Sequence, residues 1–210
     1  MNKRGVLAIV SGFSGAGKGT VMKALMNKYD NYALSISATS RAPRPGEQEG
    51  REYFYKTVEQ FEKMIEQDEL IEYAQYVGNY YGTPKAYVEE KLNEGKDVIL
   101  EIELQGAMKV KAKMPDTVLI FITPPSAQEL KNRLVGRGTE DEATINARLK
   151  RASEEAEYMD KYDYLLINDD LDTCVRELHE LIQSEHSKVG RNIDRINFIR
   201  EDVKVFSEGE

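Results

Sequence analysis

A glycine-rich loop directly behind an apolar run constrains the fold of this chain more than any other feature. The run "VLAIV" at residues 6–10 is followed by "GFSGAGKGT" at residues 12–20. Between a strand and a helix, such glycines let consecutive backbone N–H groups point inward, and the helix N-terminus adds positive potential. The spacing of Gly12, Gly17 and Lys18 fits the phosphate-binding pattern G-x-x-x-x-G-K-[ST] up to its last position. The loop therefore predicts binding of a nucleoside triphosphate.

Two other glycine motifs each fail at one position. A dinucleotide fingerprint beginning at Gly15 and Gly17 requires Gly or Ala where this chain has Thr20. A nucleophile elbow around Ser14 requires Gly where Ala16 stands. A glycine-rich turn with an exposed lysine is a further alternative, but the order of strand, loop, lysine and helix argues against it.

The last position of the loop pattern indicates how a metal is held. Gly19 stands where GTPases and motor ATPases have a hydroxyl that binds Mg²⁺ directly. We therefore expect Mg²⁺ to be held through phosphates and water, and Thr20 to face an α-phosphate. The ending "GKGT" is shared by several nucleoside monophosphate kinases, which favours transfer between two small nucleotides.

Apolar runs alternate with segments of helical periodicity along most of the chain. Strands that are apolar on both faces and alternate with helices predict a parallel sheet covered on both sides, an α/β fold. The predicted strands are residues 6–10, 98–104, 117–123 and 164–167, and the predicted helices are residues 20–29, 105–113, 127–135, 143–158 and 171–185.

Two segments interrupt this alternation. Residues 37–90 are rich in Pro, Gly and charge, and we expect an inserted α+β subdomain of short antiparallel strands and one helix, at residues 58–67. "GRGTEDEAT" predicts a small lid, in which Thr139 and Glu142 have the spacing of a capping box. The expected division is core (1–36, 91–135 and 150–187), insertion (37–90), lid (136–149) and C-terminal tail (188–210).

Composition excludes several classes of partner. A net charge of −8 argues against a general nucleic-acid binder. No apolar run approaches the roughly 20 residues that span a bilayer, and the N-terminus does not read as a signal peptide, so we expect no membrane partner and a cytoplasmic location. The single cysteine, Cys174, excludes an internal disulfide and a zinc cluster. We expect a solvated helix face at His179 and His186, and helix capping rather than calcium binding at "NDDLD".

Transfer between two nucleotides requires a second anion site and a mobile cationic cover. Arginines gather in three places that could supply them, although each group alone is also typical of a solvated surface. The candidates are Arg41, Arg44, Arg51 and Tyr53 in "SRAPRPGEQEGREYFY", Arg133 and Arg137 in "LKNRLVGRG", and Arg148 and Arg151 on the next helix.

Acidic residues are candidates for recognition of a base. A carboxylate attracts the N1–H and 2-amino donors of guanine and repels N1 of adenine, and leaving it without donors is costly. Glu72 by itself reads as an exposed acid in a charge-rich protein. Glu101 and Glu103 in "LEIEL" alternate in an apolar strand, so we expect them on one face of it. We also expect each carboxylate to be paired with a cation or a hydrogen-bond donor.

From residue 5 to about residue 187 the chain resembles the guanylate kinases of bacterial type. The motifs that carry the resemblance, specific in their order and spacing, are "SGFSGAGKGT", "SATSRAPRPGE", "REYFY", "IEYAQYVGNYYGTP", "LEIELQGA", "PPS", "LVGRGTEDEATINARL" and "YDYLLINDD". The resemblance implies a parallel-sheet core with a GMP-binding insertion and a lid.

The resemblance also implies roles for matching positions. ATP would be held by Gly12, Phe13, Ser14, Gly15, Ala16, Gly17, Lys18, Gly19 and Thr20, with Asn168 near the adenine. The GMP phosphate would be held by Arg41, Arg44, Tyr53 and Tyr81, and guanine by Ser37, Glu72, Thr83 and Glu103. Catalysis would depend on Lys18, Arg41, Arg133, Arg137 and Arg148, with Glu101 near the water shell of Mg²⁺. Phe13 replaces the usual proline and is expected to loosen the loop slightly.

The implied reaction is direct in-line transfer of a phosphoryl group from ATP to GMP, and to dGMP, giving ADP and the diphosphate. Two alternatives stay open at this point: a kinase for another monophosphate, and a catalytically inactive guanylate-kinase-like domain that binds peptides, although such domains have degraded loops. Whether the chain forms a homo-oligomer is also left open.

Overall fold

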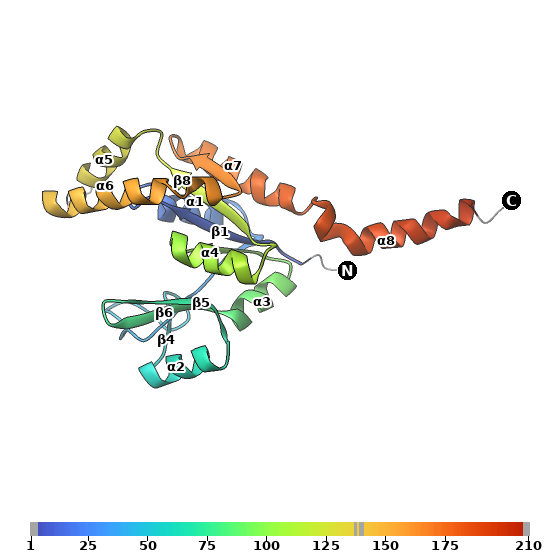
Figure 1. The fold of residues 1–210 in the computed structure, drawn as a ribbon, viewed down its shortest axis with the longest axis horizontal. Helices are drawn as coiled ribbons and strands as arrows, with labels where there is room; N and C mark the ends of the chain where they lie inside the picture. Colours follow the sequence, from blue (N-terminus) through green and yellow to red (C-terminus); the bar gives the residue numbers. More distant parts are fainter. Residues whose placement is uncertain (1–3, 137, 139–140, 208–210) are drawn as a thin grey trace.

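The centre of the protein is a five-stranded sheet in the order β2-β7-β1-β8-β9, and every neighbouring pair is parallel (Figure 1). The computed structural model describes residues 4–136, 138 and 141–207. The five strands are β1 (Leu7–Gly12), β2 (Tyr32–Leu34), β7 (Asp97–Glu101), β8 (Val118–Thr123) and β9 (Tyr164–Ile167). The three central strands are buried along almost their whole length, as strands covered on both faces must be.

Helices cover both faces of this sheet, which confirms the predicted α/β class. The helices α1 (Lys18–Lys28) and α7 (Leu171–Glu185) pack on one face. The helices α3 (Lys85–Asn93) and α4 (Leu104–Lys113) pack on the other. At the carboxyl end of the strands, α5 (Ala127–Gly136), α6 (Glu142–Ala156) and the short η1 (Met159–Lys161) contribute to a third cluster.

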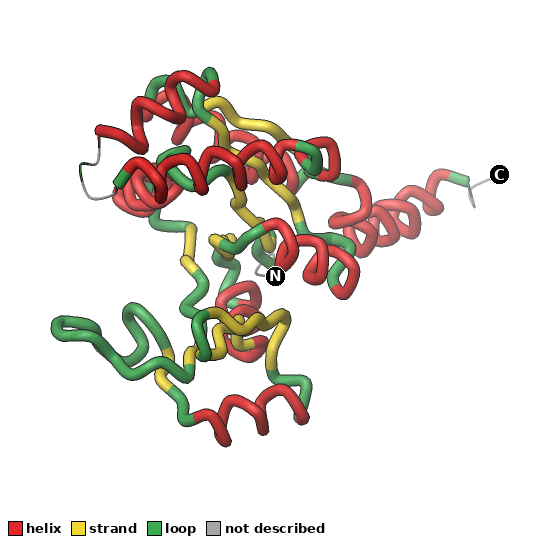
Figure 2. The backbone as a smooth tube through the Cα atoms, turned by 60° about the vertical axis from the view of Figure 1, so that its left-hand side comes forward, coloured by secondary structure: helices red, strands yellow, loops and turns green. Residues whose placement is uncertain are grey.

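A second sheet belongs to the segment that interrupts the alternation. Its order is β4-β3-β6-β5, and Figure 2 shows it with its helix on one side of the molecule. The β3–β6 and β5–β6 pairs are antiparallel as expected, but the β3–β4 pair is parallel. The elements are β3 (Ala38–Thr39), β4 (Phe54–Tyr55), α2 (Val58–Glu66), β5 (Leu70–Tyr76) and β6 (Asn79–Pro84).

Local interactions explain how α2 forms and packs. Thr57 and Gln60 form a capping box, in which each side chain bonds the other residue's backbone N–H. Phe61 is the buried residue of this helix and packs against Ala38 and Leu70.

Several predicted boundaries were wrong. The strand predicted to reach residue 104 ends at Glu101, the last residue of β7 that pairs with β1, and Glu103 is the N-cap of α4. The two acids therefore do not alternate within one strand. At α6 the N-cap is Asp141, whose side chain accepts a 2.8 Å hydrogen bond from the backbone N–H of Thr144. Thr139, predicted to begin a capping box, lies outside the described residues.

His179 of α7 and His186, the C-cap of that helix, do not lie on a solvated face. Nδ1 of His179 is 2.8 Å from the hydroxyl of Tyr32, and its ring stacks on Tyr29 with the centroids 3.7 Å apart. Nε2 of His186 is 2.7 Å from Oδ1 of Asp97, a buried carboxylate. The prediction failed because these partners lie on other elements, at the end of α1 and on β2 and β7, and are not visible in the helix sequence itself.

One smaller prediction about α7 was correct. The side chain of Asp170 accepts a 2.9 Å hydrogen bond from the backbone N–H of Thr173 and so caps the helix. Cys174 is free and buried.

The C-terminal segment extends away from the rest of the molecule (Figure 1). It consists of η2 (Val189–Asn192), α8 (Ile193–Asp202) and η3 (Val203–Phe206), and none of their residues is buried. In the part of the chain that the structure describes, no helix is both long and apolar enough to cross a bilayer.

Candidate active site

The glycine-rich loop connects β1 to α1 at the carboxyl edge of the sheet, and two of its glycines are required by close approach. A Cβ on Gly12 would lie 2.0 Å from the carbonyl oxygen of Ile122 on the neighbouring strand. Gly17 is the N-cap of α1 with φ of 89°, and a Cβ there would lie 2.5 Å from Nδ2 of Asn168. No other residue type fits either position without displacing its neighbours.

Lys18 is the first residue of α1 and folds back over the loop. Its Nζ donates hydrogen bonds to the carbonyl oxygens of Gly12 at 2.7 Å and Phe13 at 3.2 Å. The ammonium group is therefore held directly beside the amides that would surround a phosphate. A phosphate dianion binds an ammonium group more strongly than carbonyl groups do, so a nucleotide would compete for Lys18.

Phe13 contributes to the position of the loop. Its side chain is buried, and its ring packs edge-on against Phe121 of β8 with the centroids 5.1 Å apart. These contacts tether the loop to the core. Whether the loop is looser than with a proline at this position stays a prediction.

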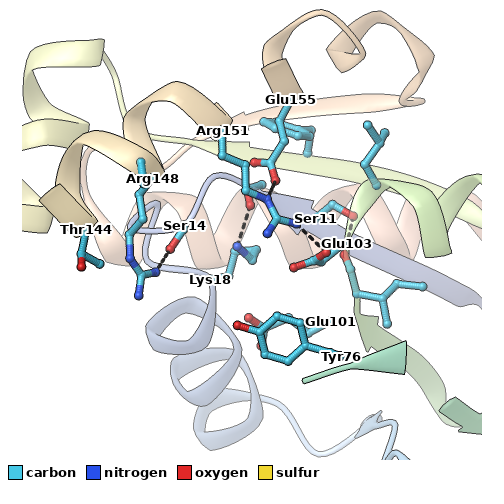
Figure 3. A pocket seen from close by; sticks show the side chains of 15 residues that line it. Ser11, Ser14, Lys18, Tyr76, Glu101, Glu103, Thr144, Arg148, Arg151 and Glu155 are labelled. Carbon is cyan, nitrogen blue, oxygen red and sulfur yellow. Dashed lines mark hydrogen bonds and ion pairs between the residues drawn. The ribbon is translucent and has the colours of Figure 1, made fainter. Parts of the chain in front are cut away.

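Three polar side chains from distant segments contact the same loop. Nδ2 of Asn168, which is buried, donates a 2.8 Å hydrogen bond to the carbonyl oxygen of Ala16. NH1 of Arg133 approaches that oxygen at 3.5 Å, while its Nε donates to Glu129. Arg148 of α6 donates to the hydroxyl of Ser14 (Figure 3). The predicted cations Arg133 and Arg148 thus reach the loop, and Arg137 lies outside the described residues.

A cavity of about 630 Å³ opens above the loop. Lys18, Glu101, Glu103 and Arg148 line it, as the sequence led us to expect (Figure 3). Arg151, a candidate cation of the sequence, also lines the cavity, whereas Ser11, Tyr76 and Glu155 were not predicted as part of this site. They could not be found from motifs because only the tertiary fold places the hairpin tip of the second sheet and the face of α6 at this point.

The predicted phosphate-binding residues of the insertion form a separate group. NH2 of Arg41 lies 3.0 Å from both carboxylate oxygens of Glu47, and its guanidinium lies 5.3 Å from the ring centroid of Tyr53. The rings of Tyr53 and Tyr81 are 6.0 Å apart. Arg44 is exposed, and its backbone N–H donates to Glu47. The described lining of the loop cavity includes none of these residues.

Glu47 is the residue of this group that sequence analysis did not single out, although it closes the motif "RPGE". The backbone N–H of Arg44, together with the Tyr55 hydroxyl and the Arg41 guanidinium, holds the pKa of Glu47 below its usual range. An ionised Glu47 holds Arg41 beside Tyr53 and Tyr81. A phosphate arriving there would compete with Glu47 for Arg41.

Glu72 is not an exposed acid, contrary to how it reads in isolation. It lies on β5 with its carboxyl partly buried, and Thr83 of β6 donates a 2.8 Å hydrogen bond to its Oε1. Burial raises the pKa of Glu72 above its usual range. Gly106 of α4 lies close by, because a Cβ there would sit 3.4 Å from Oε2 of Glu72. Two of the four predicted base-binding residues, Glu72 and Thr83, are therefore in direct contact.

The remaining predicted residues are less closely grouped. Ser37 precedes β3, where its carbonyl oxygen accepts from the backbone N–H of Phe54. Glu101 is exposed at the end of β7 in the loop cavity. Within the described residues, no group of three or more His, Cys, Asp or Glu side chains could hold a metal ion. A carboxylate such as Glu101 beside a phosphate loop suits Mg²⁺ that is bound mainly by phosphates and water.

These features define a class of protein. A glycine-rich loop at the carboxyl edge of a parallel sheet, with its lysine and two arginines beside it, is the nucleotide-binding arrangement of P-loop α/β proteins.

Comparison with known proteins gives the family. The family model described as guanylate kinase matches residues 4–185. The chain is 48% identical to the guanylate kinase of Lactococcus lactis subsp. lactis (strain IL1403) over 205 residues, 98% of this chain and 100% of that protein. It is 51% identical to the guanylate kinase of Caldanaerobacter subterraneus subsp. tengcongensis over 96% of this chain and 98% of that protein. The chain belongs to the guanylate kinase family.

A solved structure agrees with this assignment. The crystal structure of guanylate kinase from Anaplasma phagocytophilum superposes with a TM-score of 0.70 at 33% identity, and the match covers 90% of each chain.

Proposed function

We propose that the chain transfers the γ-phosphoryl group of ATP to GMP, and to dGMP, giving ADP and the nucleoside diphosphate. One observation carries the proposal most directly: a single cavity holds Lys18 of the phosphate loop, the carboxylates Glu101 and Glu103, and the arginines Arg148 and Arg151. Relatives about half identical over nearly the whole chain bear the name of this activity.

The loop side of the cavity suits ATP. The backbone amides of residues 12–20 would surround the phosphates, with Lys18 against the β- and γ-phosphates and Thr20 near the α-phosphate. Asn168 supports the loop through a hydrogen bond to Ala16, and we assign it to the adenine side of the ATP site. When bound with ATP, Mg²⁺ would supply charge that neutralises the phosphates, and we assign the contact with its water shell to Glu101, which lines the cavity.

The insertion suits GMP. We assign the GMP phosphate to Arg41, Arg44, Tyr53 and Tyr81, and the guanine to Ser37, Glu72, Thr83 and Glu103. The residues assigned to the GMP phosphate do not line the loop cavity. The γ-phosphate of ATP and the phosphate of GMP would therefore meet only after residues 37–90 move towards the core. The segment at residues 136–149 would serve as the lid, and the core would comprise residues 1–36, 91–135 and 150–187.

The chemical step requires no general base. The attacking oxygen of GMP is already ionised, so catalysis consists of positioning and of stabilising the charge on the transferring group. Lys18, Arg133 and Arg148 contact the loop and are placed to do this, and we assign the same role to Arg41 and Arg137. No covalent intermediate is involved.

The test is ADP formation from Mg-ATP with GMP, dGMP, AMP, CMP and UMP offered separately, with Lys18→Ala as the inactive control. Turnover with GMP and dGMP, and little with AMP, is the expected result. Turnover with another monophosphate alone would leave a kinase but overturn the base-binding role of Glu72 and Glu103. ATP binding without any turnover would overturn the proposal in favour of a binding domain.

Cytoplasmic location, the absence of nucleic-acid and membrane partners, and the oligomeric state stay predictions.

A further inference from the structure

One face of α6 carries two arginines that contact different parts of the cavity. Arg148 and Arg151 are three residues apart, so their side chains leave the helix on the same side. Arg148 donates to Ser14 in the phosphate loop. Arg151 donates instead to Glu103, at the start of α4, as Figure 3 shows. The two arginines therefore divide the cavity between its phosphate end and its carboxylate end.

Arg151 is held by two carboxylates. Its NH2 group donates to Oε2 of Glu103 at 2.6 Å, and its Nε donates to Oε1 of Glu155 at 3.0 Å. Glu155 is four residues further along the same helix and is the more buried of the two acids. Because Glu155 lies on the same helix as Arg151, this pair forms within α6. It directs the guanidinium group of Arg151 across the cavity towards Glu103.

Glu103 depends on such a contact for its orientation. Its side chain is 75% exposed and, although Glu103 occupies the N-cap of α4, it makes no capping hydrogen bond. A long side chain without a fixed contact loses rotamer entropy when a ligand immobilises it. The bond from Arg151 uses Oε2, and a carboxylate has a second oxygen with which to accept a donor from a ligand.

We propose that Arg151 is a positioning residue for guanine recognition: it orients Glu103 towards the N–H donors of the base, and Glu155 in turn holds Arg151. This inference rests on the proposed function, and within it on the assignment of Glu103 to guanine. It gives Arg151 a role distinct from the charge stabilisation assigned to Arg148. It also makes the helix that follows the lid part of the base-binding site.

The alternative is that Arg151 binds a phosphate of ATP or the transferring group. The two roles separate in steady-state kinetics. A residue that orients Glu103 changes the KM for GMP and leaves kcat and the KM for ATP unchanged. A residue that binds the transferring phosphoryl group changes kcat, because its interaction strengthens in the transition state.

The experiment measures kcat and both KM values for wild type, Arg151→Gln, Arg151→Lys, Glu155→Gln, Glu103→Gln and the Arg151→Gln/Glu103→Gln double variant. Arg176→Gln is the matched control, because Arg176 also pairs with a glutamate four residues along its helix, on α7. Calorimetric titration with GMP in the absence of ATP checks binding directly. Thermal melts confirm that each variant is folded.

Arg151→Gln is expected to raise the KM and the Kd for GMP by about two- to fivefold, the range that corresponds to an exposed ion pair. Arg151→Lys keeps the positive charge but not the planar fork of donors and is expected to lie nearer to wild type, and Glu155→Gln is expected to show a smaller rise. In the double variant, Arg151→Gln is expected to add nothing to the effect of Glu103→Gln. Arg176→Gln is expected to match wild type throughout.

Three outcomes would overturn the inference. Additive effects of Arg151→Gln and Glu103→Gln would show that the two residues act independently. A fall in kcat or a rise in the KM for ATP with unchanged GMP binding would place Arg151 at the phosphates. If the wild type phosphorylates GMP and Glu103→Gln leaves the KM for GMP unchanged, Glu103 does not belong to the base site, while the proposed function stands. Wild type that does not phosphorylate GMP would instead overturn the proposed function itself.

Discussion

Thr83 donates a hydrogen bond of 2.8 Å from its Oγ1 to Oε1 of Glu72 across the β5–β6 hairpin. Thr83 is 1% exposed. Burial raises the pKa of Glu72, and the bond from Thr83 opposes that rise only in part. The pair therefore holds a carboxylate in a place that disfavours its charge. Such a cost is typical of a group that is placed for a ligand rather than for stability.

Replacing Glu72 with glutamine should weaken GMP binding. The glutamine can still accept from Thr83, but its amide faces the guanine donors with reduced acceptor strength. We expect the KM for GMP to rise by about tenfold, the equivalent of about 1.4 kcal/mol, with a smaller change in the KM for ATP. Steady-state kinetics of Glu72→Gln check this, with Glu66→Gln on the exposed side of α2 as control. An unchanged KM for GMP would move base recognition elsewhere.

The same substitution should stabilise the empty protein. Because the folded-state pKa of Glu72 is raised, the ionised form costs stability above that pKa and the cost disappears as the pH falls through it. At pH 8, Glu72→Gln is expected to increase the free energy of unfolding by about 0.5–2 kcal/mol. Urea unfolding at pH 8 and pH 5 measures this. A gain that is equal at both pH values would show that the charge is not its cause.

Lys18→Ala should abolish most turnover and leave GMP binding intact. The ammonium group lies beside the loop carbonyls of Gly12 and Phe13, whereas the residues assigned to GMP lie on the insertion and at Glu103. We expect kcat to fall by roughly 10²–10³-fold, as when a charge-stabilising donor is removed. Lys23→Ala, an exposed site on the same helix, is the control. Turnover near the wild-type rate would contradict the assignment of the loop.

Asn168→Ala should weaken ATP binding and destabilise the fold. The substitution removes the donor that satisfies the carbonyl oxygen of Ala16 inside the protein. Leaving such a group unsatisfied costs about 1–3 kcal/mol, and the loop should lose its fixed geometry. We expect the KM for ATP to rise by about tenfold, equivalent to about 1.4 kcal/mol. Thermal melts and ATP kinetics test this against Asn132→Ala, whose side chain is exposed on α5.

His179 should make the fold sensitive to acid. Burial lowers its pKa below the usual value, although Asp97 and Glu180 act in the opposite direction. The unfolded chain therefore takes up a proton near pH 6.5 before the folded one does, so stability is lost as the pH falls below that value. Urea unfolding of wild type and His179→Gln at pH 7.5 and 5.5 checks this. We expect the variant to lose less stability on acidification, and an equal loss in both proteins would assign the effect to other groups.

The parts of the fold that could be predicted are those whose signals are local. The apolar runs of β1 and β8 and the glycines of the phosphate loop indicate their structure within about ten residues of sequence. Asp170 likewise caps α7 through a bond to a residue three positions away. These elements need no knowledge of the rest of the chain.

Other elements depend on contacts that the sequence does not display. The helix α3 was not predicted because only Val88 and Leu92 of its residues are buried, and they face a sheet formed by distant segments. β7 ends at Glu101 because its pairing with β1 ends there.

The same distinction applies to side chains. The arginines near the phosphate loop could be predicted because positively charged residues cluster in the sequence. The contact of Tyr32 with His179 joins residues 147 apart in the sequence, and only the fold brings them together. Tyr76 lines the cavity for the same reason, because β5 of the hairpin that carries it packs against α4.

Glu103 gives the site a further property. Ser, Thr, Asp or Asn at the N-cap of a helix usually stabilises it by about 1 kcal/mol, and α4 forgoes that gain because its N-cap side chain reaches Arg151 instead. A laboratory screen for heat-resistant variants would therefore enrich short polar residues at position 103. Selection for thermal resistance alone would erode substrate discrimination in this chain, and any programme of directed evolution would need to score guanine preference alongside melting temperature.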